Sequence, residues 1–575
     1  MKKYKKIYSS IHPSSIPLIF PTGSRGNLEP IPGSIGHEAG YTLDRVPIHR
    51  RAQSHTHSHT HSYTTDTLDT PISLPCMCLD LGRKLEYPEE TSAAQGEHAN
   101  STYTGCTGRK AVVGAGIGGT ATAHFLRQHF GPEVRIDVFE KQEVGGRLAT
   151  VTVNNQAYET GGSIIHSLNL HMQDFMKQLG LKYRKSVAGK MAVSNGKELV
   201  LEETDWYLLD LFRLWWRYGI SFIRMQMWVE EIMEKFMRIY KYQAHGYAFS
   251  TVDELLNSLG GSGFLNMTRR SLSESLLELG VSQRFIDEVV APIMWVNYGQ
   301  NVSMPAFVGA VSLAGAQANL WAVEGGNKLV CSELLKLAKA NLIRSQVTTV
   351  SLQPAGESYQ YKLDYTTQAG IASDIYDIVI IASPLQQNVN SGISFLGFEP
   401  QLAEMTGSYH TMVASVVHGY LNCTYFGFPD PKLFPFTSVL TTEMADLFFN
   451  SVSSICPVNI STVFRRKQPH EAGVYKVFSP KPLEKDELKT LFKSYYSVQV
   501  TDWKAYPRYG SSQEMPPMIL HDGLYYLNGI EWAASAMEMS SVAAKNIALL
   551  AYHRWTRQLE MIDQQDLMHK IKTEL

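Results

Sequence analysis

The feature that most constrains this chain is a glycine-rich turn that joins a short apolar run to a helical pattern, within residues 110–126. The apolar run at 111–113 predicts a buried strand, and the pattern after the turn predicts a helix with one apolar face. Gly114 fits a tight turn, Gly116 lets the backbone approach a pyrophosphate, and Gly119 allows the helix to pack closely on the strand. The N–H groups and positive dipole end of this helix favour phosphate. The stretch therefore predicts a dinucleotide-binding α/β unit.

The residues that follow indicate which dinucleotide is bound. Residues 135–140 predict a second strand that ends in Glu140, about 20 residues beyond the glycine turn, where an acid binds ribose hydroxyls. A second glycine pair, Gly145 and Gly146, comes soon afterwards and is followed by Arg147, whose guanidinium suits phosphate. This extension resembles flavin enzymes related to amine oxidases and phytoene desaturases, and plain nicotinamide dehydrogenases lack it. We therefore predict FAD as the cofactor of a Rossmann-type domain.

Two further glycine pairs fit the same site. Gly161 and Gly162 would let the backbone pass close to the isoalloxazine or ribityl chain, although an ordinary β-turn is the alternative. The pair at 325–326 opens a predicted helix at 329–338 and would bring backbone near the flavin again. Between these and the C-terminus, residues 377–385 predict an apolar parallel strand that ends in small residues and a proline, as in the strand that flanks FAD in this superfamily.

The last flavin element is predicted near the C-terminus. Residues 524–532, which include Gly529 and Glu531, predict a strand and a turn that run into a helix of small residues, Ala533–Ala551. The N-terminus of that helix would stabilise the anion of reduced flavin at its N1/O2 edge. The alternative is a C-terminal packing helix without a role in cofactor binding.

Residues 206–242 form a long helical pattern that is rich in aromatic residues, methionine and leucine. Charged residues interrupt it too often for a transmembrane span, at Arg213, Arg217, Arg224, Glu230, Glu231 and Glu234. The first interpretation is an ordinary core helix or helix pair. The second is a surface that lines a long apolar tunnel or touches a membrane, because methionine adapts to irregular alkyl ligands. Further short helices are predicted over residues 250–279.

Composition limits the class of protein. The 575 residues, 44% of them hydrophobic, can bury a large core in two domains. A net charge of −2 gives no sign of a nucleic-acid footprint. Six cysteines in this length exclude a disulfide scaffold, and the sequence leaves open whether Cys423 and Cys456 form a bridge or are free thiols. We predict no metal site, because Cys76 and Cys78 lack nearby partners.

The N-terminal residues 1–108 predict a disordered segment or a gene-model extension. They are rich in Ser, Pro, His, Thr and Gly and show no sustained periodicity. His55, His57, His59 and His61 alternate with Ser and Thr, which is what a translated AC dinucleotide repeat would give. Metal chelation by these histidines is the alternative. We assign the segment no function.

The order of these elements predicts two interleaved domains. An FAD-binding domain of the amine oxidase/phytoene desaturase kind would be built from residues 109–189, 320–394 and 521–575, the last part including a C-terminal tail. An α+β substrate domain would be built from a helical part, 190–319, and a second part, 395–520, of short strand-like runs and turns.

Several longer tracts resemble one family, the prenylcysteine oxidases. These are residues 113–119, 144–150, 242–250, 321–332, 524–531 and 572–575. The resemblance runs from about Lys110 to Leu575, and residues 426–435 are closer to the prenylcysteine oxidase-like branch. The family has a signal peptide just before the first strand, where this chain has residues 1–108.

The resemblance implies an FAD thioether oxidase that takes farnesyl- or geranylgeranyl-cysteine, oxygen and water to cysteine, an isoprenoid aldehyde and hydrogen peroxide, in the degradation of prenylated proteins. Hydride loss to flavin needs no strong base, so the candidate catalytic residues, His166 and Glu531, are groups that set the polarity of the pocket. His166 and His171 could also be loop histidines satisfied by backbone. The alternatives are a flavin oxidase or desaturase of another lipid-like substrate, and a catalytically silent FAD-binding paralogue.

Location and partners follow from the same resemblance. It implies a lysosomal or secreted protein with a small-molecule substrate, a peripheral contact with a membrane or lipoprotein, and no obligate protein partner. N-glycosylation sequons agree with a secretory route, and they occur at Asn100, Asn266, Asn301, Asn422 and Asn459. The start of the chain shows no recognisable signal peptide, because the apolar run at 16–20 is too short.

Overall fold

The computed structural model describes residues 108–573, apart from 188, 317–319, 357, 390, 444–446 and 512. These residues belong to one compact unit. The histidine repeat, Cys76, Cys78, Cys106 and Asn100 lie outside the described residues, so the predictions about them stay predictions.

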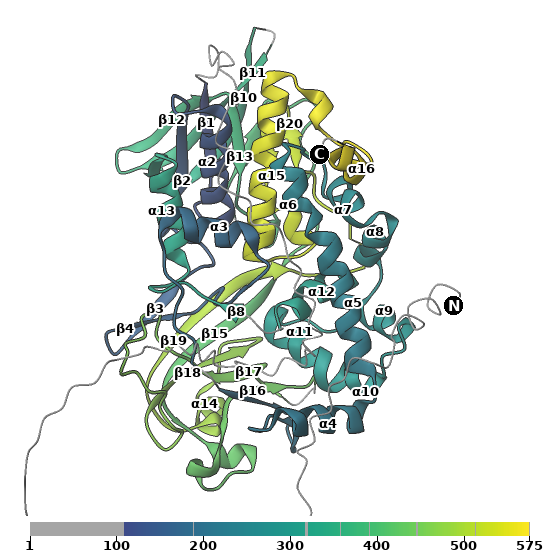
Figure 1. The fold of residues 1–575 in the computed structure, drawn as a ribbon. Coiled ribbons are helices and arrows are strands. Elements are labelled where there is room, and N and C mark those ends of the chain that lie inside the picture. The colour runs from purple at the N-terminus through teal and green to yellow at the C-terminus, as the bar shows by residue number, and fades with distance from the viewer. Residues whose placement is uncertain are drawn as a thin grey trace, which may run out of the picture. The chain divides into compact units, whose positions relative to one another are not determined.

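The centre of the unit is a six-stranded sheet in the order β20-β21-β13-β1-β2-β9 (Figure 1). All neighbouring strands are parallel except β20 and β21. The strands are β1 (Arg109–Val113), β2 (Arg135–Glu140), β9 (Asn341–Arg344), β13 (Ile378–Ile381), β20 (Ile519–His521) and β21 (Leu524–Tyr526). β13 is buried along its whole length, as expected for a parallel strand covered on both faces. The prediction of an α/β fold with a Rossmann-type domain is confirmed.

Four helices cover one face of this sheet, and the other face packs against the smaller sheet described below. They are α2 (Ile117–Phe130), α3 (Leu170–Leu179), α13 (Lys328–Leu337) and α15 (Met537–Thr556), and Figure 1 shows α2 beside α15. α15 is buried almost all round because its small residues, such as Ala543 and Ala544, let neighbouring helices approach closely. This helix begins four residues later than the predicted Ala533–Ala551, because residues 528–532 form a 3₁₀ turn (η5, Asn528–Trp532) and Ala536 is extended.

A smaller sheet, antiparallel except where β10 meets β14, is formed by the middle of the chain. Its order is β12-β11-β10-β14, with β10 (Val347–Ala355), β11 (Ser358–Thr367), β12 (Gly370–Tyr376) and β14 (Ser394–Leu396). Two short ribbons complete this part, β3 (Thr150–Val153) with β4 (Gln156–Glu159) and β5 (Ile165–His166) with β8 (Leu320–Trp321).

The third large sheet has seven strands, in the order β19-β15-β18-β17-β16-β6-β7. It is antiparallel except where β16 meets β6. Its strands are β6 (Lys190–Ser194), β7 (Leu199–Glu202), β15 (Tyr409–Leu421), β16 (Phe436–Thr441), β17 (Ser451–Ser454), β18 (Gly473–Ser479) and β19 (Phe492–Pro507). Two strands therefore come from the predicted first substrate segment and five from the second.

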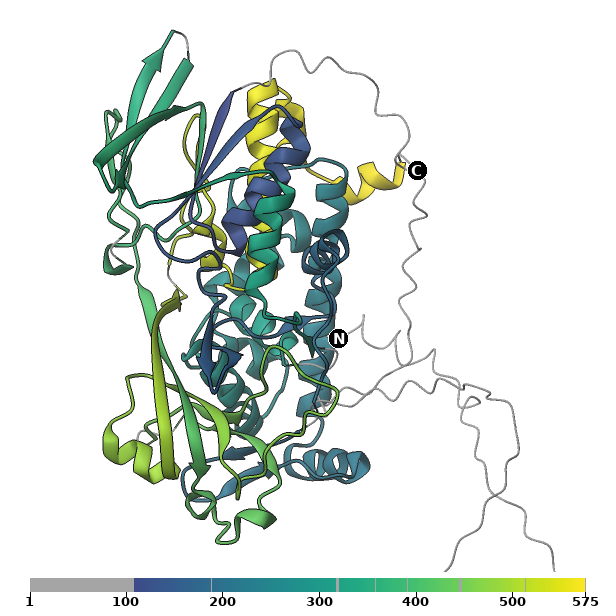
Figure 2. The ribbon, with the colours of Figure 1, turned by 90° about the vertical axis from the view of Figure 1, so that its left-hand side faces the viewer.

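Helices from residues 207–314 stand against these sheets (Figure 2). They are α4 (Tyr207–Tyr218), α5 (Ser221–Phe236), α6 (Arg238–Ala244), α7 (Val252–Gly260), α8 (Ser262–Arg269), α9 (Leu272–Glu278), α10 (Gln283–Phe285), η1 (Ile286–Val290), α11 (Ala291–Tyr298) and α12 (Ala306–Ala314). The predicted helical stretch 206–242 is thus three helices, broken at Gly219, where φ is +63°, and at Met237. The remaining elements are α14 (Lys485–Leu491), α16 (Leu567–Thr573), η2 (Gln387–Val389), η3 (Cys423–Phe426), η4 (Pro431–Leu433) and η6 (Leu559–Met561).

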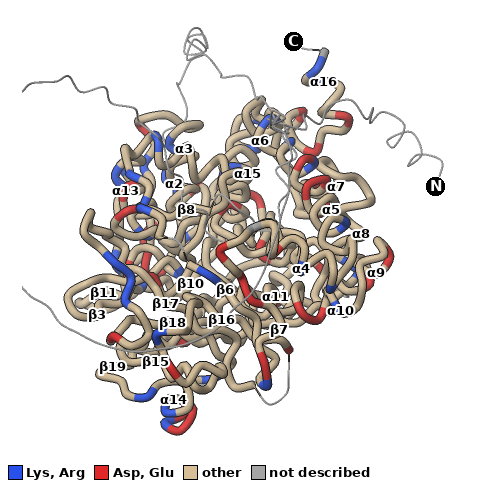
Figure 3. The backbone as a smooth tube through the Cα atoms, turned by 60° about the horizontal axis from the view of Figure 1, so that its bottom comes forward, with Lys and Arg blue, Asp and Glu red and all other residues tan. Residues whose placement is uncertain are grey.

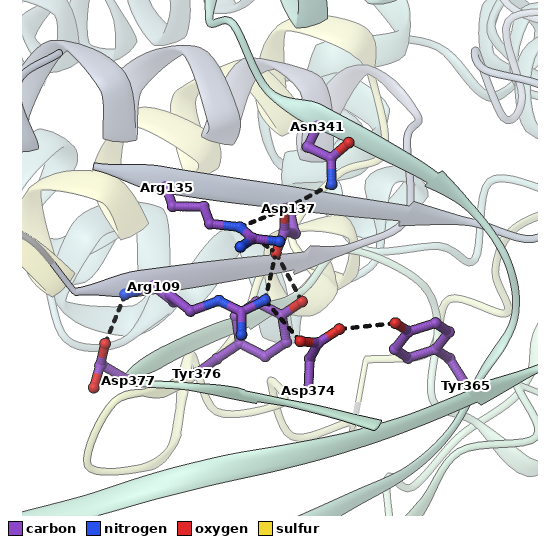
Figure 4. A network of polar contacts seen from close by, with 8 residues as sticks. All are labelled: Arg109, Arg135, Asp137, Asn341, Tyr365, Asp374, Tyr376 and Asp377. Carbon is purple, nitrogen blue, oxygen red and sulfur yellow. Dashed lines mark hydrogen bonds and ion pairs between the residues drawn. The ribbon is translucent and has the colours of Figure 1, made fainter. Parts of the chain in front are cut away.

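A buried carboxylate fastens the amino ends of the central strands to the smaller sheet (Figure 4). Asp137 of β2 is fully buried and accepts hydrogen bonds from Asn341 at 2.9 Å, Tyr376 at 2.9 Å and Arg109 at 3.1 Å. Arg109 also donates to Asp374 of β12 at 2.9 Å. Burial alone would raise the pKa of Asp137, but the hydrogen bonds from Asn341, Tyr376 and Arg109 outweigh it, so the pKa is lowered.

We predict that Asp137→Ala lowers the free energy of unfolding by about 3–5 kcal/mol, because it leaves Tyr376 and Asn341 without their acceptor and removes one of the two carboxylates that Arg109 binds. The folded-state pKa of Asp137 is depressed, so its contribution is present above the unfolded pKa and is lost as pH falls through the folded pKa. Denaturant titrations between pH 7 and pH 3 should therefore show a smaller loss of stability on acidification in the variant. Asp205→Ala, whose carboxylate is exposed beside Lys190, is the control and should cost less than about 1 kcal/mol.

Candidate functional site

The first glycine turn has the backbone geometry that the sequence predicts. Gly114 has φ of +114°, and a Cβ there would lie 2.7 Å from the carbonyl oxygen of Ala382 on the neighbouring strand connection. A Cβ on Gly119 would lie 1.9 Å from the carbonyl oxygen of Gly114. The turn and the first turn of α2 can therefore approach each other only with glycine at both positions.

The second glycine turn rests directly on the first. Gly145 donates its N–H to the carbonyl of Ala115 at 3.0 Å, and Gly116 and Gly145 form a parallel bridge. Gly145 and Gly146 have φ of +125° and +57°. Glu140 is oriented by the same turns, since its Oε2 accepts the N–H of Ala115 at 2.8 Å. A carboxylate has further lone pairs, so Glu140 keeps the capacity to accept ribose hydroxyls.

These turns line a cavity of about 1060 Å³, which we call the cofactor cavity. It is at the upper end of the 300–1,000 Å³ or so that is typical of ligand sites. All the predicted site residues line it except Gly119 and Gly529, namely Gly114, Gly116, Glu140, Gly145, Gly146, Arg147, Gly161, Gly162, His166 and Glu531. Gly529 instead packs against Pro516, whose carbonyl oxygen a Cβ would meet at 2.8 Å.

An ion pair joins two of the predicted residues that are far apart in the chain, with a Glu531 carboxylate that is 1% exposed and an Arg147 side chain that is 35% exposed. Both terminal nitrogens of Arg147 donate to the Glu531 carboxylate, and Nη1 also donates to the carbonyl of Ala505 at 2.6 Å. Glu531 accepts two more hydrogen bonds, from Tyr409 Oη at 3.0 Å and from Asn528 at 2.7 Å. Burial lowers the pKa of Arg147, but the adjacent Glu531 more than compensates and raises it. The phosphate role of Arg147 and the catalytic role of Glu531 stay predictions.

The remaining glycine pairs meet through a side-chain network. Gly161 lies against the backbone of Arg147, where a Cβ would meet the Arg147 carbonyl oxygen at 1.9 Å. The Asn327 amide nitrogen donates to the carbonyl of Gly162 at 2.9 Å, and its backbone N–H donates to Glu159 at 2.7 Å. The turn that contains Gly326, with φ of +108°, is thereby held beside Gly161 and Gly162.

The two candidate histidines have different surroundings. The Nδ1 of His166 accepts the N–H of Leu168 at 3.1 Å, which leaves the hydrogen on Nε2, and burial lowers its pKa. His166 thus lines the cofactor cavity as a neutral group. His171 packs in the core, where its Nε2 pairs with Gln243 at 2.8 Å, and burial lowers its pKa to about 3.

Sequence reasoning missed Glu538, which lines the cofactor cavity from the first turn of α15. Its carboxylate accepts the N–H groups of His171 at 2.7 Å and Met172 at 3.1 Å, and the hydroxyl of Tyr240 at 2.8 Å. Burial raises its pKa to about 7, although these hydrogen bonds lower it. Glu538 therefore caps the N-terminus of α3, and an acid in a helix's first turn was the one local signal for it.

A second cavity, of about 850 Å³, adjoins the cofactor cavity, and we call it the apolar cavity. The two share Ile164, Val187, Leu320 and Arg466 among their lining residues. Its walls are mainly apolar and come from β6, β7, α4, α5 and α11. The predicted tunnel-lining role of 206–242 thus has a physical counterpart, because Leu211 and Leu214 of α4 line this cavity.

The outer face of α4 carries large apolar side chains that are open to solvent. Trp206 and Trp216 are 74% and 77% exposed, and Leu208, Phe212 and Trp215 are exposed beside them. Phe212 and Trp216 also line the apolar cavity. Figure 3 shows the charged residues of both signs interspersed along the described backbone. Among the described residues, no helix has the length and apolar character needed to cross a bilayer.

Three cysteines and four N-glycosylation sequons lie within the described residues. Cys331, Cys423 and Cys456 are free thiols, so the Cys423–Cys456 bridge that the sequence left open does not form in this structure. The side chains of Asn266 and Asn459 are exposed. The amide nitrogens of Asn301 and Asn422 donate instead to Glu443 at 3.0 Å and to the carbonyl of Thr490 at 2.9 Å. Glycosylation stays a prediction.

The residues of the cofactor cavity fit FAD. Phosphates would lie at the N-terminus of α2 between the two nested glycine turns, and Glu140 would hold the adenosine ribose. The Gly161–Gly162 backbone and the start of α15 line the rest of the same cavity.

Comparison with known proteins agrees with this architecture. Residues 201–564 match the family model described as prenylcysteine lyase, and residues 112–179 match an NAD(P)-binding Rossmann-like domain. The chain is 63% identical over 465 residues to prenylcysteine oxidase 1-like of Bos taurus, covering 81% of this chain and 94% of the relative. It is 48% identical over 475 residues to prenylcysteine oxidase 1 of Homo sapiens, covering 81% and 93%.

Solved structures show a similar fold. One of them is described as a putative protoporphyrinogen oxidase from Exiguobacterium sp. 255-15, with a TM-score of 0.51, 14% identity, and coverage of 78% of this chain and 99% of that chain. At this identity the likeness concerns the fold alone.

We predict that Gly119→Ala weakens FAD binding by about tenfold or more, because the added methyl group would force the phosphate turn away from α2. Flavin content after purification and reconstitution with FAD, read from visible absorbance, measures the effect. Gly263→Ala is the matched control, since Gly263 is also in a helix and a Cβ there meets nothing within 4 Å. Equal flavin content in both variants would contradict the placement of the phosphates.

Proposed function

The chain belongs to the prenylcysteine oxidase family, and we propose that it cleaves the thioether of prenylcysteines with oxygen as acceptor. It is an FAD-dependent oxidoreductase, as its nested glycine turns, its ribose acid and its family indicate. The observation that carries the proposal is that the cofactor cavity shares wall residues with a largely apolar cavity of about 850 Å³, which suits an isoprenoid chain.

The proposed reaction converts a prenylcysteine, water and oxygen into cysteine, the isoprenoid aldehyde and hydrogen peroxide. FAD, when bound, would take a hydride from the allylic carbon next to sulfur and pass its electrons to oxygen. Water adds to that carbon, and the resulting hemithioacetal breaks its C–S bond, so that sulfur leaves with a proton as the cysteine thiol. In prenylated proteins this carbon carries the bond to cysteine, so we place the reaction in their degradation.

The chain's own residues would orient the substrate and exclude water. Leu211, Leu214 and Val229 would contact the isoprenoid tail in the apolar cavity, where burial of apolar surface favours binding. His166, neutral because burial lowers its pKa, would keep the reacting region free of an extra charge. Such an environment favours loss of hydride to the cofactor without a strong base.

We also propose a location in the lysosome or outside the cell, with N-linked glycans at Asn266 and Asn459. Both asparagine side chains are exposed, so the glycosylation machinery can reach them without disturbing the fold. Asn301 and Asn422 are further candidates, although their amides are held by neighbouring groups.

A peripheral contact with a lipid surface is proposed for α4. Trp206, Phe212 and Trp216 present an aromatic face to solvent, and aromatic side chains, tryptophan above all, are favoured at the boundary between water and acyl chains. Because Phe212 and Trp216 also line the apolar cavity, an isoprenoid tail could pass from lipid to the cavity without crossing water.

The test of the reaction uses protein from residue 109 onward, loaded with FAD. Anaerobic farnesylcysteine should bleach the visible flavin absorbance, and air should restore it with one equivalent each of peroxide, aldehyde and free thiol. A yellow protein that ignores farnesyl- and geranylgeranyl-cysteine contradicts the proposal. A panel of amines and other lipid-like substrates would then separate an oxidase of another substrate from a silent paralogue.

For α4 we predict that the double variant Phe212→Ser/Trp216→Ser partitions onto phosphatidylcholine/phosphatidylserine vesicles about tenfold less, since two large apolar side chains are removed. Vesicle co-sedimentation measures the partition. The control is Ile371→Ser/Leu433→Ser, which removes two exposed apolar side chains elsewhere. Equal losses in both double variants would show that the contact is not made by α4.

A further inference from the structure

The cofactor cavity contains a group of charges of which only one, the carboxylate of Glu159, holds a turn of the cofactor site. Glu159 of β4, Lys476 of β18 and Arg184, which lies between α3 and β6, line this cavity, and we call them the charged cluster. Glu159 and Lys476 are only 4% and 7% exposed. Burying a charge without a partner is costly, so buried, poorly paired charges on a cavity wall point to a ligand.

Lys476 is the clearest case. Side chains alternate along β18, so that Tyr475 and Val477 pack in the core beneath the sheet while Lys476 and Phe478 face the cavity. The Lys476 Nζ lies 4.8 Å from the Phe478 ring centroid and makes no hydrogen bond or ion pair with any residue that the structure describes. Burial lowers its pKa to about 8, with Glu159 opposing and Arg184 adding to the effect, so the amine is mostly protonated at pH 7.

The charged cluster has two positive charges, on Lys476 and Arg184, and one negative charge, on Glu159. The backbone N–H of Arg184 donates to Ala322 at 2.8 Å, but its guanidinium has no hydrogen-bond acceptor within the described part of the chain. Glu159 uses Oε1 to accept the Asn327 N–H, and its Oε2 is buried without a partner. The cluster therefore has an excess of one positive charge, and its only carboxylate already accepts the N–H of Asn327.

The cluster is close to the junction of the two cavities. Val187, three residues after Arg184, lines both cavities, and its carbonyl accepts a hydrogen bond from Arg466 at 3.2 Å. Arg466 also lines both cavities. Arg466 and Arg184 are both close enough to Cys456 to lower its pKa, although burial raises it. Arg184 is therefore near the residues that the two cavities share. A ligand with an alkyl chain in the apolar cavity can thus bring a charged end to Arg184 and Lys476.

We propose that Lys476 and Arg184 bind the free carboxylate at the amino-acid end of an S-alkyl cysteine whose chain lies in the apolar cavity. The inference rests on the proposed function and adds its head-group site. The phosphates of the cofactor have their own N–H donors at α2, so the two cations are left for an anion of the substrate. A charge-assisted hydrogen bond to each cation makes the free acid a better ligand than its methyl ester.

The test measures binding without turnover. FAD-loaded protein is titrated with S-dodecylcysteine and with its methyl ester, and the change in flavin absorbance gives Kd. The saturated chain lacks the alkene that activates the carbon next to sulfur. We expect the acid to bind at least about tenfold more tightly than the ester.

Lys476→Met should weaken binding of the acid to near that of the ester and leave the ester unchanged. It should not lower Tm, because a buried amine is replaced by an apolar side chain of similar length, whereas loss of a merely structural lysine would lower Tm. Arg184→Met removes the second cation independently. It should likewise reduce the ratio of the ester's Kd to the acid's Kd. Lys493→Met, on the exposed face of β19, is the control and should keep the ratio of the unaltered protein.

Two results would overturn the head-group site: an unaltered protein that binds acid and ester equally or binds neither, or a Lys476→Met variant that weakens both ligands alike. Neither result depends on oxidation. Acid-selective binding together with no oxidation of farnesylcysteine would instead overturn the proposed reaction and leave the carboxylate site standing.

Discussion

The ion pair between Arg147 and the buried carboxylate of Glu531 is the interaction on which the site depends. It joins the second glycine turn to the segment before α15, and through Ala505 and Tyr409 it also joins both to the seven-stranded sheet. Taking the Glu531 carboxylate out of water is expensive, and the arrangement is stable because both of its oxygens accept hydrogen bonds. Loss of either partner would leave a charge unpaired at the point where three parts of the chain meet.

The same need to bring distant segments together explains why the chain passes several times between the six-stranded and the seven-stranded sheet. The cofactor cavity needs the turn after β1, the turn after β2, the Gly325–Asn327 turn and the start of α15, and these come from segments up to several hundred residues apart. The strands of the seven-stranded sheet are inserted between these segments, with β6 and β7 from one insertion and β15 to β19 from the other. Each return of the chain therefore places one more wall of the cavity, which no single continuous segment supplies.

The sequence predicted the parts of the fold that depend on local chemistry. Glycines with positive φ or forced backbone contacts, such as Gly114 and Gly119, have no substitute, so their spacing within a strand–helix–strand pattern that ends in an acid predicts the turn. The strand at 135–140 was predicted with its observed bounds because it is a short apolar run that ends in an acid. The pairing of Arg147 with Glu531 and the placement of Lys476 beside Arg184 could not be predicted, because they depend on contacts between distant segments. The late start of α15 was also missed, since the small residues 533–536 would fit a helix but form a turn that ends in the extended Ala536.

In the proposed function, cofactor and substrate are held by different kinds of group, and this separates the two roles physically. The cofactor end of the cavity is made largely of backbone, with N–H groups at nested turns, so glycine spacing preserves it whatever the neighbouring side chains are. The substrate end is made of side chains, namely the apolar walls from α4 and α5 and the cations Arg184 and Lys476. A few substitutions there would change the ligand without disturbing the cofactor. The glycine pattern therefore predicts the cofactor much more firmly than the substrate, and the substrate has to be argued from the apolar cavity and the two cations beside it.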